Sequence, residues 1–236
     1  MMSAPAPSSV YEDGRYLEQN PGWHEEDSPW KAAHVLRMVS AHGLAPRSVA
    51  EVGCGGGMIL VELAARMPEA ELTGYEISPQ AFARCTERSR ERLTFRFEDL
   101  LQTDARHDLL LTMDVVEHVE DYMGFLRGLR RHGGLHILHI PLDLSVQTVL
   151  RASGPLLHAR QKVGHLHYFS RETALATLTD CGFEVVDWFY TYPAPGAPGR
   201  RLRTRMAGWL RRVAARMAPD LSVRVLGGSS ILVLCR

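Results

Sequence analysis

The sequence lacks a charge excess, a long apolar run and a secretory leader. Lys and Arg together number 27, as do Asp and Glu, so the chain is formally neutral. A nucleic-acid-binding protein usually carries a basic excess, so this balance argues against one. No stretch approaches the roughly 18 apolar residues of a membrane span. The segment Met1–Gly14 also has no apolar core of a signal peptide.

Cysteine is scarce, and its positions form no pattern. The four cysteines, Cys54, Cys85, Cys181 and Cys235, are widely scattered, and no pair has C-x-x-C or metal-ligand spacing. Reduced thiols in a cytoplasmic protein are the natural interpretation. The sequence therefore predicts no metal site.

Strand and helix patterns alternate through the first two thirds of the chain. A helix is expected from Asp27-Ser28-Pro29 to about His42, with Ala33, Leu36 and Val39 inward. Strands are expected at 48–52, 71–76, 93–97, 108–113 and 135–140, and helices at 58–66, 79–90 and 122–130, the last ended by Gly133-Gly134. Such alternation predicts an α/β fold, a doubly wound, mostly parallel sheet with helices on both faces.

The last third departs from this alternation. Short helices are expected at 144–151 and 156–162, a helix at 171–181, and strands at 183–191 and 229–235. We expect residues 1–20 to form a flexible arm and residues 21–236 to form a single domain. Insertions at about 141–170 and 192–225 would shape the substrate side.

A glycine-rich turn follows the first expected strand. Glu51 ends that strand, and Gly53, Cys54, Gly55 and Gly57 follow. Glycine lets a backbone bend sharply and approach a ligand closely. The dinucleotide fingerprint G-x-G-x-x-G would need glycine at position 58, where this chain has Met58. An acidic residue before G-x-G-x-G instead resembles motif I of the class I S-adenosylmethionine (SAM)-dependent methyltransferases.

Three further segments continue this resemblance in the expected order. Glu76-Ile77 ends the second strand, and Asp99-Leu100 follows the third. Residues 114–121 read D-x-x-E-H-x-x-D and are similar to small-molecule methyltransferases of the ubiquinone O-methyltransferase type. The resemblance covers about residues 30–190. It implies a seven-stranded Rossmann-like sheet whose last strand is antiparallel and lies between the fifth and the sixth.

The resemblance also implies roles for these residues. Glu51 and the glycine turn would hold the methionine amine of SAM, and Asp114 with Val115 would lie near that end. A carboxylate such as Glu76 can grip two ribose hydroxyls, with Ile77 beside it. Asp99 would accept from the adenine amine, next to Leu100. The demethylated product would be S-adenosylhomocysteine.

Two histidines are candidates for proton removal from the acceptor. His118 follows the fourth strand, and His165 lies in a loop similar to the substrate-side H-x-x-x-F/Y-S loop of related methyltransferases. Histidine suits general-base work because its pKa lies near neutrality. His165 and His167 as a metal pair are disfavoured, because no carboxylate or cysteine is near them in the sequence.

These patterns predict a SAM-dependent methyltransferase acting on a small molecule, with oxygen favoured as the acceptor atom by the resemblance. Two alternatives stay open: a non-catalytic SAM-binding module and a nicotinamide-dependent Rossmann oxidoreductase. Residues 200–217 carry arginines and an apolar stripe at helical spacing. That segment could pack on the sheet, contact an anionic membrane or lipid-linked substrate, or bind RNA, which the neutral charge disfavours. The sequence does not predict an oligomeric state.

Overall fold

A single seven-stranded sheet organises the molecule. The computed structural model describes residues 25–192 and 216–236. The strands are β1 (Ser48–Val52), β2 (Glu71–Glu76), β3 (Leu93–Phe97), β4 (His107–Met113), β5 (Gly133–Pro141), β6 (Val185–Thr191) and β7 (Ser230–Cys235). Their order in the sheet is β3-β2-β1-β4-β5-β7-β6. The first five strands pair in parallel, and β7 is antiparallel to both β5 and β6. The predicted Rossmann-like sheet is confirmed, including the place of its last strand.

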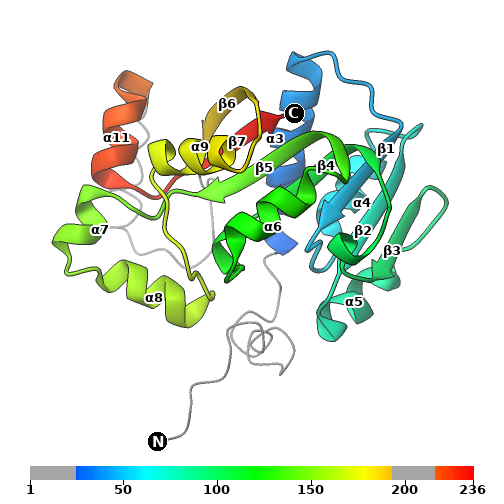
Figure 1. Ribbon diagram of the computed structural model, residues 1–236, viewed down its shortest axis with the longest axis horizontal. Coiled ribbons are helices and arrows are strands. Elements are labelled where there is room, and N and C mark those ends of the chain that lie inside the picture. Colours follow the sequence, from blue (N-terminus) through cyan, green and yellow to red (C-terminus); the bar gives the residue numbers. More distant parts are fainter. Residues whose placement is uncertain (1–24, 193–215) are drawn as a thin grey trace, which may run out of the picture.

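Helices cover both faces of this sheet (Figure 1). The α-helices are α3 (Ser28–Ala41), α4 (Met58–Ala64), α5 (Pro79–Thr86), α6 (Tyr122–Leu129), α7 (Val146–Leu150), α8 (Gly154–Lys162), α9 (Arg171–Asp180) and α11 (Pro219–Leu226). Three short 3-10 helices are η1 (Glu25–Asp27), η2 (Leu100–Gln102) and η3 (Val116–His118). Side-chain caps start several helices; for example, the Ser78 hydroxyl accepts from the Ala81 N–H at the start of α5.

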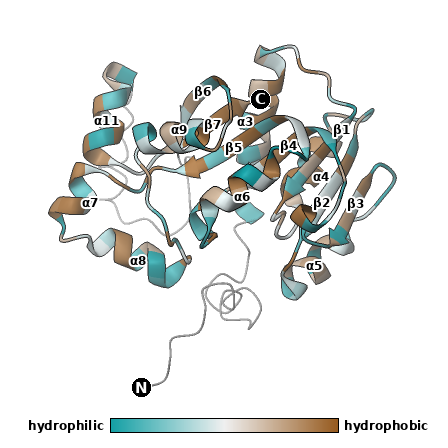
Figure 2. Cartoon of the chain, in the orientation of Figure 1, coloured by the Kyte–Doolittle hydropathy of each residue, from teal (hydrophilic) through white to brown (hydrophobic). Residues whose placement is uncertain are grey.

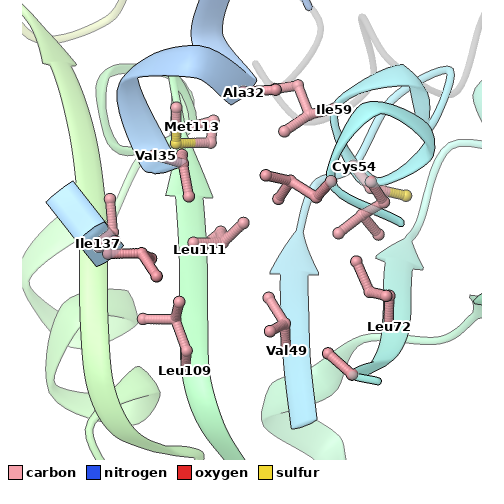
Figure 3. Packing of buried hydrophobic residues seen from close by; sticks show 14 of the residues in the cluster. Ala32, Val35, Val49, Cys54, Ile59, Leu72, Leu109, Leu111, Met113 and Ile137 are labelled. Carbon is pink, nitrogen blue, oxygen red and sulfur yellow. The ribbon is translucent and has the colours of Figure 1, made fainter. Parts of the chain in front are cut away.

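Two apolar cores follow from the alternation of side chains along each strand. Leu109 and Leu111 of β4 face one core, where α3, α4 and α5 pack, while Leu110 faces the other, where α6 and α9 pack. Figure 3 shows side chains from α3 and α4, Val35 and Ile59 among them, meeting those of the strands. Because the strands are packed on both faces, the carboxyl ends of β1, β2, β4 and β5 are held in fixed positions along one edge of the sheet.

Two local predictions are wrong. Ala33 is exposed, because α3 packs through the neighbouring stripe that includes Ala32, Val35 and Met38. Gly133 does not end the preceding helix but begins β5. A Cβ at Gly133 would lie 2.8 Å from the His136 ring, so the position needs glycine for close packing within the sheet.

Beyond the sheet, α7, α8 and α11 lie together at one end of the molecule (Figure 1). Apolar residues of α7 are exposed there, Leu150 to 80% of its surface, and α7 is coloured as hydrophobic in Figure 2. The expected arm at 1–20 and nearly all of 200–217 lie outside the described residues. Contact of 200–217 with a membrane therefore stays a prediction. Within the described ranges, no helix is long and apolar enough to cross a bilayer.

Candidate active site

A cavity of about 770 Å³ opens at the carboxyl ends of the central strands. In open α/β sheets this edge is where ligands bind. Its walls come from η1 and the start of α3, the turn after β1, and the ends of β2, β4 and β5 with the segments that follow them. The predicted site residues that line it are Glu51, Gly53, Cys54, Gly55, Gly57, Glu76, Ile77, Asp114, Val115, His118 and His165.

The turn after β1 needs its glycines for conformation and for space. Gly53, Gly55 and Gly57 all have positive φ, which L side chains adopt only with strain. A Cβ at Gly57 would lie 2.5 Å from the Phe95 ring, and one at Gly53 would lie 3.0 Å from Val115. The turn therefore presents bare backbone to the cavity.

Glu76 fixes the shape of this turn. Its Oε2 accepts from the Gly55 N–H at 2.8 Å, and its Oε1 accepts from the N–H groups of Ile77 and Ser78 at 2.9 and 2.7 Å. Burial raises the pKa of the Glu76 carboxyl, and these three donors partly offset that effect. Glu76 thus joins the ends of β1 and β2 and lines the cavity, and its Oε2, with one donor recorded, can accept a further hydrogen bond.

Glu51 is a buried carboxylate in need of a partner. It is 1% exposed, and its Oε2 has no hydrogen-bond partner among the described residues. Burial raises the pKa of Glu51 to about 8, although the positive charge of Lys31 opposes the shift. An unpaired buried carboxylate at a cavity wall is suited to receive a cationic group of a ligand.

Asp114 is the centre of a charged network at the end of β4. Its Oδ2 lies 2.7 Å from Lys31 Nζ, and its Oδ1 accepts from His139 Nδ1 at 2.5 Å. His139 Nε2 in turn forms a hydrogen bond with the Thr191 hydroxyl at 2.7 Å. Burial alone would raise the pKa of Asp114, but His139 and Lys31 outweigh it and hold that pKa well below its usual range. Asp114 is therefore an anion, held in a left-handed conformation with φ of 57°.

The start of α3 closes one side of the cavity. Glu25 pairs with Arg88 at 3.0 Å, and Arg88 also donates to the Gly56 carbonyl. This link ties η1 to the glycine turn. Trp30 lines the cavity and lies edge-on to the His139 ring, with ring centroids 5.8 Å apart. The Trp30 ring and the Glu25–Arg88 link can both shield a ligand from water.

A second group of side chains lies at another part of the cavity wall. Nδ1 of His165 donates to Asp143 Oδ2 at 2.5 Å, and the His165 ring packs edge-on against His118, with centroids 5.0 Å apart. Nδ1 of His118 donates to the Gly164 carbonyl at 3.1 Å, while its Nε2 lies 3.8 Å from Glu117 Oε1. Burial and the neighbouring His165 lower the pKa of His118 to about 4, and burial raises that of Glu117 well above its ordinary value.

His167 does not join this group. Its Nε2 donates to the Val119 carbonyl at 2.9 Å, and its ring packs at a tilt against Tyr122, with centroids 4.4 Å apart. The histidine that contacts His165 is His118, not His167. Although no carboxylate is near His165 in the sequence, Asp143 and Glu117 approach it in space, so the ground for disfavouring a metal there does not hold in the structure.

Asp99 and Leu100 lie outside the residues that line the cavity. The Asp99 side chain accepts from the Leu101 N–H and caps η2, and Leu100 is fully buried in the core. At the neighbouring strand ends, Ile77 is 59% exposed and Phe97 is 51% exposed. The adenine role of Asp99 and Leu100 stays a prediction.

Several residues that line the cavity were not chosen from the sequence, among them Glu25, Lys31, Glu117, His139 and Asp143. Asp143 could have been found, because it comes directly after a strand whose carboxyl end had to lie at the ligand edge. Lys31 and Glu25 had no such signal, since their position depends on how α3 packs on the sheet. His139 belongs to a strand interior, where the sequence pattern indicates only core.

Comparison with known proteins agrees with this geometry. A family model described as "Methyltransferase domain" matches residues 23–187. A trans-aconitate 2-methyltransferase of Methylobacterium radiotolerans is 30% identical over 141 residues, covering 56% of this chain and 53% of that protein. A ubiquinone biosynthesis O-methyltransferase of a Methylobacterium species is 29% identical over 152 residues, covering 53% and 60%. The chain therefore spans only about half the length of these curated relatives.

Solved structures share the fold across nearly the whole chain. Magnesium protoporphyrin IX methyltransferase from Synechocystis with bound S-adenosylhomocysteine has a TM-score of 0.62 at 18% identity, covering 98% of this chain and 97% of that one. The N-methyltransferase NodS from Bradyrhizobium japonicum, with the same nucleoside, has a TM-score of 0.55 at 18% identity, covering 87% and 85%. The class predicted from the glycine turn and its three following acidic segments is thus confirmed: the chain belongs to the methyltransferase-domain family and has the class I fold.

Proposed function

We propose that this protein transfers the methyl group of SAM to an oxygen atom of a small molecule. The observation that carries the proposal is the Glu51 carboxylate, buried at the cavity wall with Oε2 unpaired among the described residues. The ammonium of a methionine moiety would complete it, since a buried charge needs an opposite charge. Glu76, beside the bare glycine turn, offers the lone pairs that a ribose needs.

SAM supplies an electrophilic methyl on a sulfonium when it is bound. The chain's residues hold and orient: Glu51 and Glu76 take the two polar ends of the cofactor, and Trp30 and the Glu25–Arg88 link exclude water. In the transfer the acceptor oxygen forms its bond to the methyl as the carbon–sulfur bond breaks toward sulfur. The hydroxyl proton must leave, and we propose that the group formed by His118 and His165, on the same cavity, assists its removal.

The choice of oxygen as the methylated atom is a separate part of the proposal. One curated relative is named an O-methyltransferase, whereas one structural neighbour is named an N-methyltransferase. The D-x-x-E-H-x-x-D segment supports oxygen, because it resembles the ubiquinone-type enzymes. The described structure also has an imidazole–carboxylate pair, His165 with Asp143, at the cavity. An amine acceptor, which is already nucleophilic when neutral, has less need of such a group.

Two experiments test these parts separately. Calorimetry with SAM, S-adenosylhomocysteine and NAD should show binding of the first two only, and Glu51→Gln should weaken binding of SAM by tenfold or more. Incubation of a small-molecule extract with ¹³C-methyl SAM should then give labelled product whose carbon chemical shift is that of a methoxy group. Binding of NAD alone would refute the cofactor. A labelled N-methyl or C-methyl product would refute oxygen while leaving methyl transfer intact, and SAM binding without any label transfer would favour the non-catalytic module.

The histidines have a matched control in the same loop. His118→Gln and His165→Gln should each lower turnover on the labelled acceptor at least tenfold, whereas His167→Gln should not, because that ring faces Tyr122 and not the cavity. Near wild-type turnover in both cavity variants would remove these histidines from the mechanism.

A further inference from the structure

Glu117 is the least explained polar group at the cavity. It is 0% exposed, and neither of its carboxylate oxygens has a hydrogen-bond partner among the described residues. Leaving a carboxylate buried without donors is costly, so such groups pair with a cation or a proton. Glu117 follows Asp114 by three residues, yet Asp114 has its own partners in Lys31 and His139. A cation that pairs with Glu117 must therefore come from elsewhere.

Two imidazoles lie beside this carboxylate. One ligand atom from each of Glu117, His118 and His165 can be chosen so that all three lie within 4.8 Å of one another. Around a Zn²⁺ ion with bonds near 2 Å, donor atoms lie about 3.4 Å apart. The separation of 3.8 Å between His118 Nε2 and Glu117 Oε1 is already close to that value. Closing the rest takes a movement of about 1 Å or less per side chain.

The backbone holds the three side chains in this arrangement. The Glu117 carbonyl accepts from the N–H groups of Leu166 and His167 at 2.7 and 3.2 Å, which fastens the loop of His165 to η3. The hydrogen bond from His118 to the Gly164 carbonyl adds a third attachment. A loop attached at three points brings residues 117 and 165, distant in sequence, to one spot.

Hydrogen bonds also orient both rings. Asp143 holds Nδ1 of His165, and the Gly164 carbonyl holds Nδ1 of His118. A metal-binding histidine characteristically donates its other ring N–H to a carboxylate or a backbone carbonyl, and these two rings show one of each. Both rings are thus held through Nδ1 at the cavity wall.

We propose that Glu117, His118 and His165 bind a divalent transition-metal ion, Zn²⁺ by the chemistry of two imidazoles and a carboxylate, with an open coordination position toward the cavity. Three protein ligands with a vacant fourth position are the arrangement of catalytic zinc sites. All three residues line the cavity, so an oxygen of the acceptor can reach that position. This inference rests on the proposed function for its role: the ion would lower the pKa of the acceptor hydroxyl, and the proton would pass to solvent.

In this arrangement His118 and His165 are ligands and not the proton acceptors that their sequence positions suggested. Asp143 is then a positioning residue that acts through His165. The preferred acceptor would be a molecule that presents an oxygen anion or a hydroxyl to the ion.

Metal binding itself is the test, and it needs no acceptor. The full-length chain is stripped with a chelator, desalted, and titrated with Zn²⁺ and with Co²⁺ as a spectroscopic probe. The wild type should bind one ion per chain and show the visible absorption band of Co²⁺ in a low-symmetry nitrogen and oxygen site. Glu117→Gln and His165→Gln should weaken the ion at least a hundredfold, and Asp143→Asn about tenfold or more. His167→Gln should bind as the wild type does.

Stability separates loss of ligands from loss of fold. Without metal, Glu117→Gln should be at least as stable as the wild type, because it removes a buried carboxylate without changing shape. Added Zn²⁺ should raise the melting temperature of the wild type and of His167→Gln but not of Glu117→Gln. No ion bound by the wild type, or equal binding by all variants, would overturn the site, and a proton would then be the partner of Glu117. Methyl transfer by chain stripped of metal would overturn the role while leaving the proposed function standing.

Discussion

Replacing Glu51 by Gln should make the ligand-free protein more stable at alkaline pH while weakening SAM binding. The pKa of Glu51 rises from an ordinary 4.5 to about 8, mainly because the carboxyl is buried. Between these values the folded chain keeps a proton that the unfolded chain has lost. Stability therefore falls as pH rises through this window. Glutamine has the same shape and carries no charge at any pH, so the variant loses this dependence.

The size of the effect follows from the same two values. Each pH unit inside the window removes about 1.4 kcal/mol from the free energy of unfolding. Between pH 6 and pH 8 the loss is about 2 kcal/mol, because ionisation of the folded state limits it near the upper end. For a chain of this size that corresponds to roughly 5–8 °C in melting temperature.

The assay is thermal unfolding of the ligand-free wild type and Glu51→Gln at pH 6, 7 and 8. The melting temperature of the variant minus that of the wild type should grow by roughly 5–8 °C across this range. All other titrating groups are common to both chains and cancel in the difference. Glu69→Gln is the matched control, because that side chain is 93% exposed, and its difference from wild type should stay constant. A constant difference for Glu51→Gln too would refute the reasoning that burial raises this pKa.

Three further outcomes are expected. Binding of SAM at pH 7 should release close to one proton from the wild type and none from Glu51→Gln, measured by calorimetry in buffers of different ionisation enthalpy. Gly57→Ala should lower the free energy of unfolding in urea by more than 2 kcal/mol, because its Cβ would meet Phe95, whereas Gly43→Ala, with open space around it, should cost only about 1 kcal/mol. Equal costs would show that the contact is not what requires glycine. Asp114→Asn, which tolerates positive φ, should cost about 3 kcal/mol at neutral pH by leaving Lys31 unpaired. Because the pKa of Asp114 is depressed, that cost should shrink only as acid titrates it below 3.8, and a cost that is the same in acid would contradict the ion pair.

The sequence predicted those features that depend on local patterns. The period of apolar residues located all seven strands, and Asp27-Ser28-Pro29 marked the start of α3. Glu51 and Gly57 could be chosen by their places before and within the glycine turn. Few strand-to-helix turns have a conformation that admits a ligand, so the turn itself is a local signal. What failed depends on packing between distant segments. The rotation of α3, which exposes Ala33 and turns Lys31 toward Asp114, is set by the sheet beneath it.

On the acceptor side of the cavity, too, local patterns predicted single residues, while contacts between distant segments could not be predicted. His118 and His165 were each recognisable, but their contact depends on hydrogen bonds that N–H groups of a loop almost fifty residues away donate to the Glu117 carbonyl. No local pattern encodes that contact. For the same reason His167, two residues from His165, seemed as good a candidate and faces elsewhere.

The position of β7 has a consequence for how the protein is made. It comes last of the seven strands in chain order, yet it lies inside the sheet, with β5 on one side and β6 on the other. Until Ser230–Cys235 leaves the ribosome, both neighbours have open edges, and β6 has no strand to hold it. The nascent chain therefore exposes unpaired strand edges during this interval, and such edges are prone to pair with other molecules. We expect a chaperone to hold the earlier segments during this interval. Insertion of β7 between β5 and β6 would then complete the sheet.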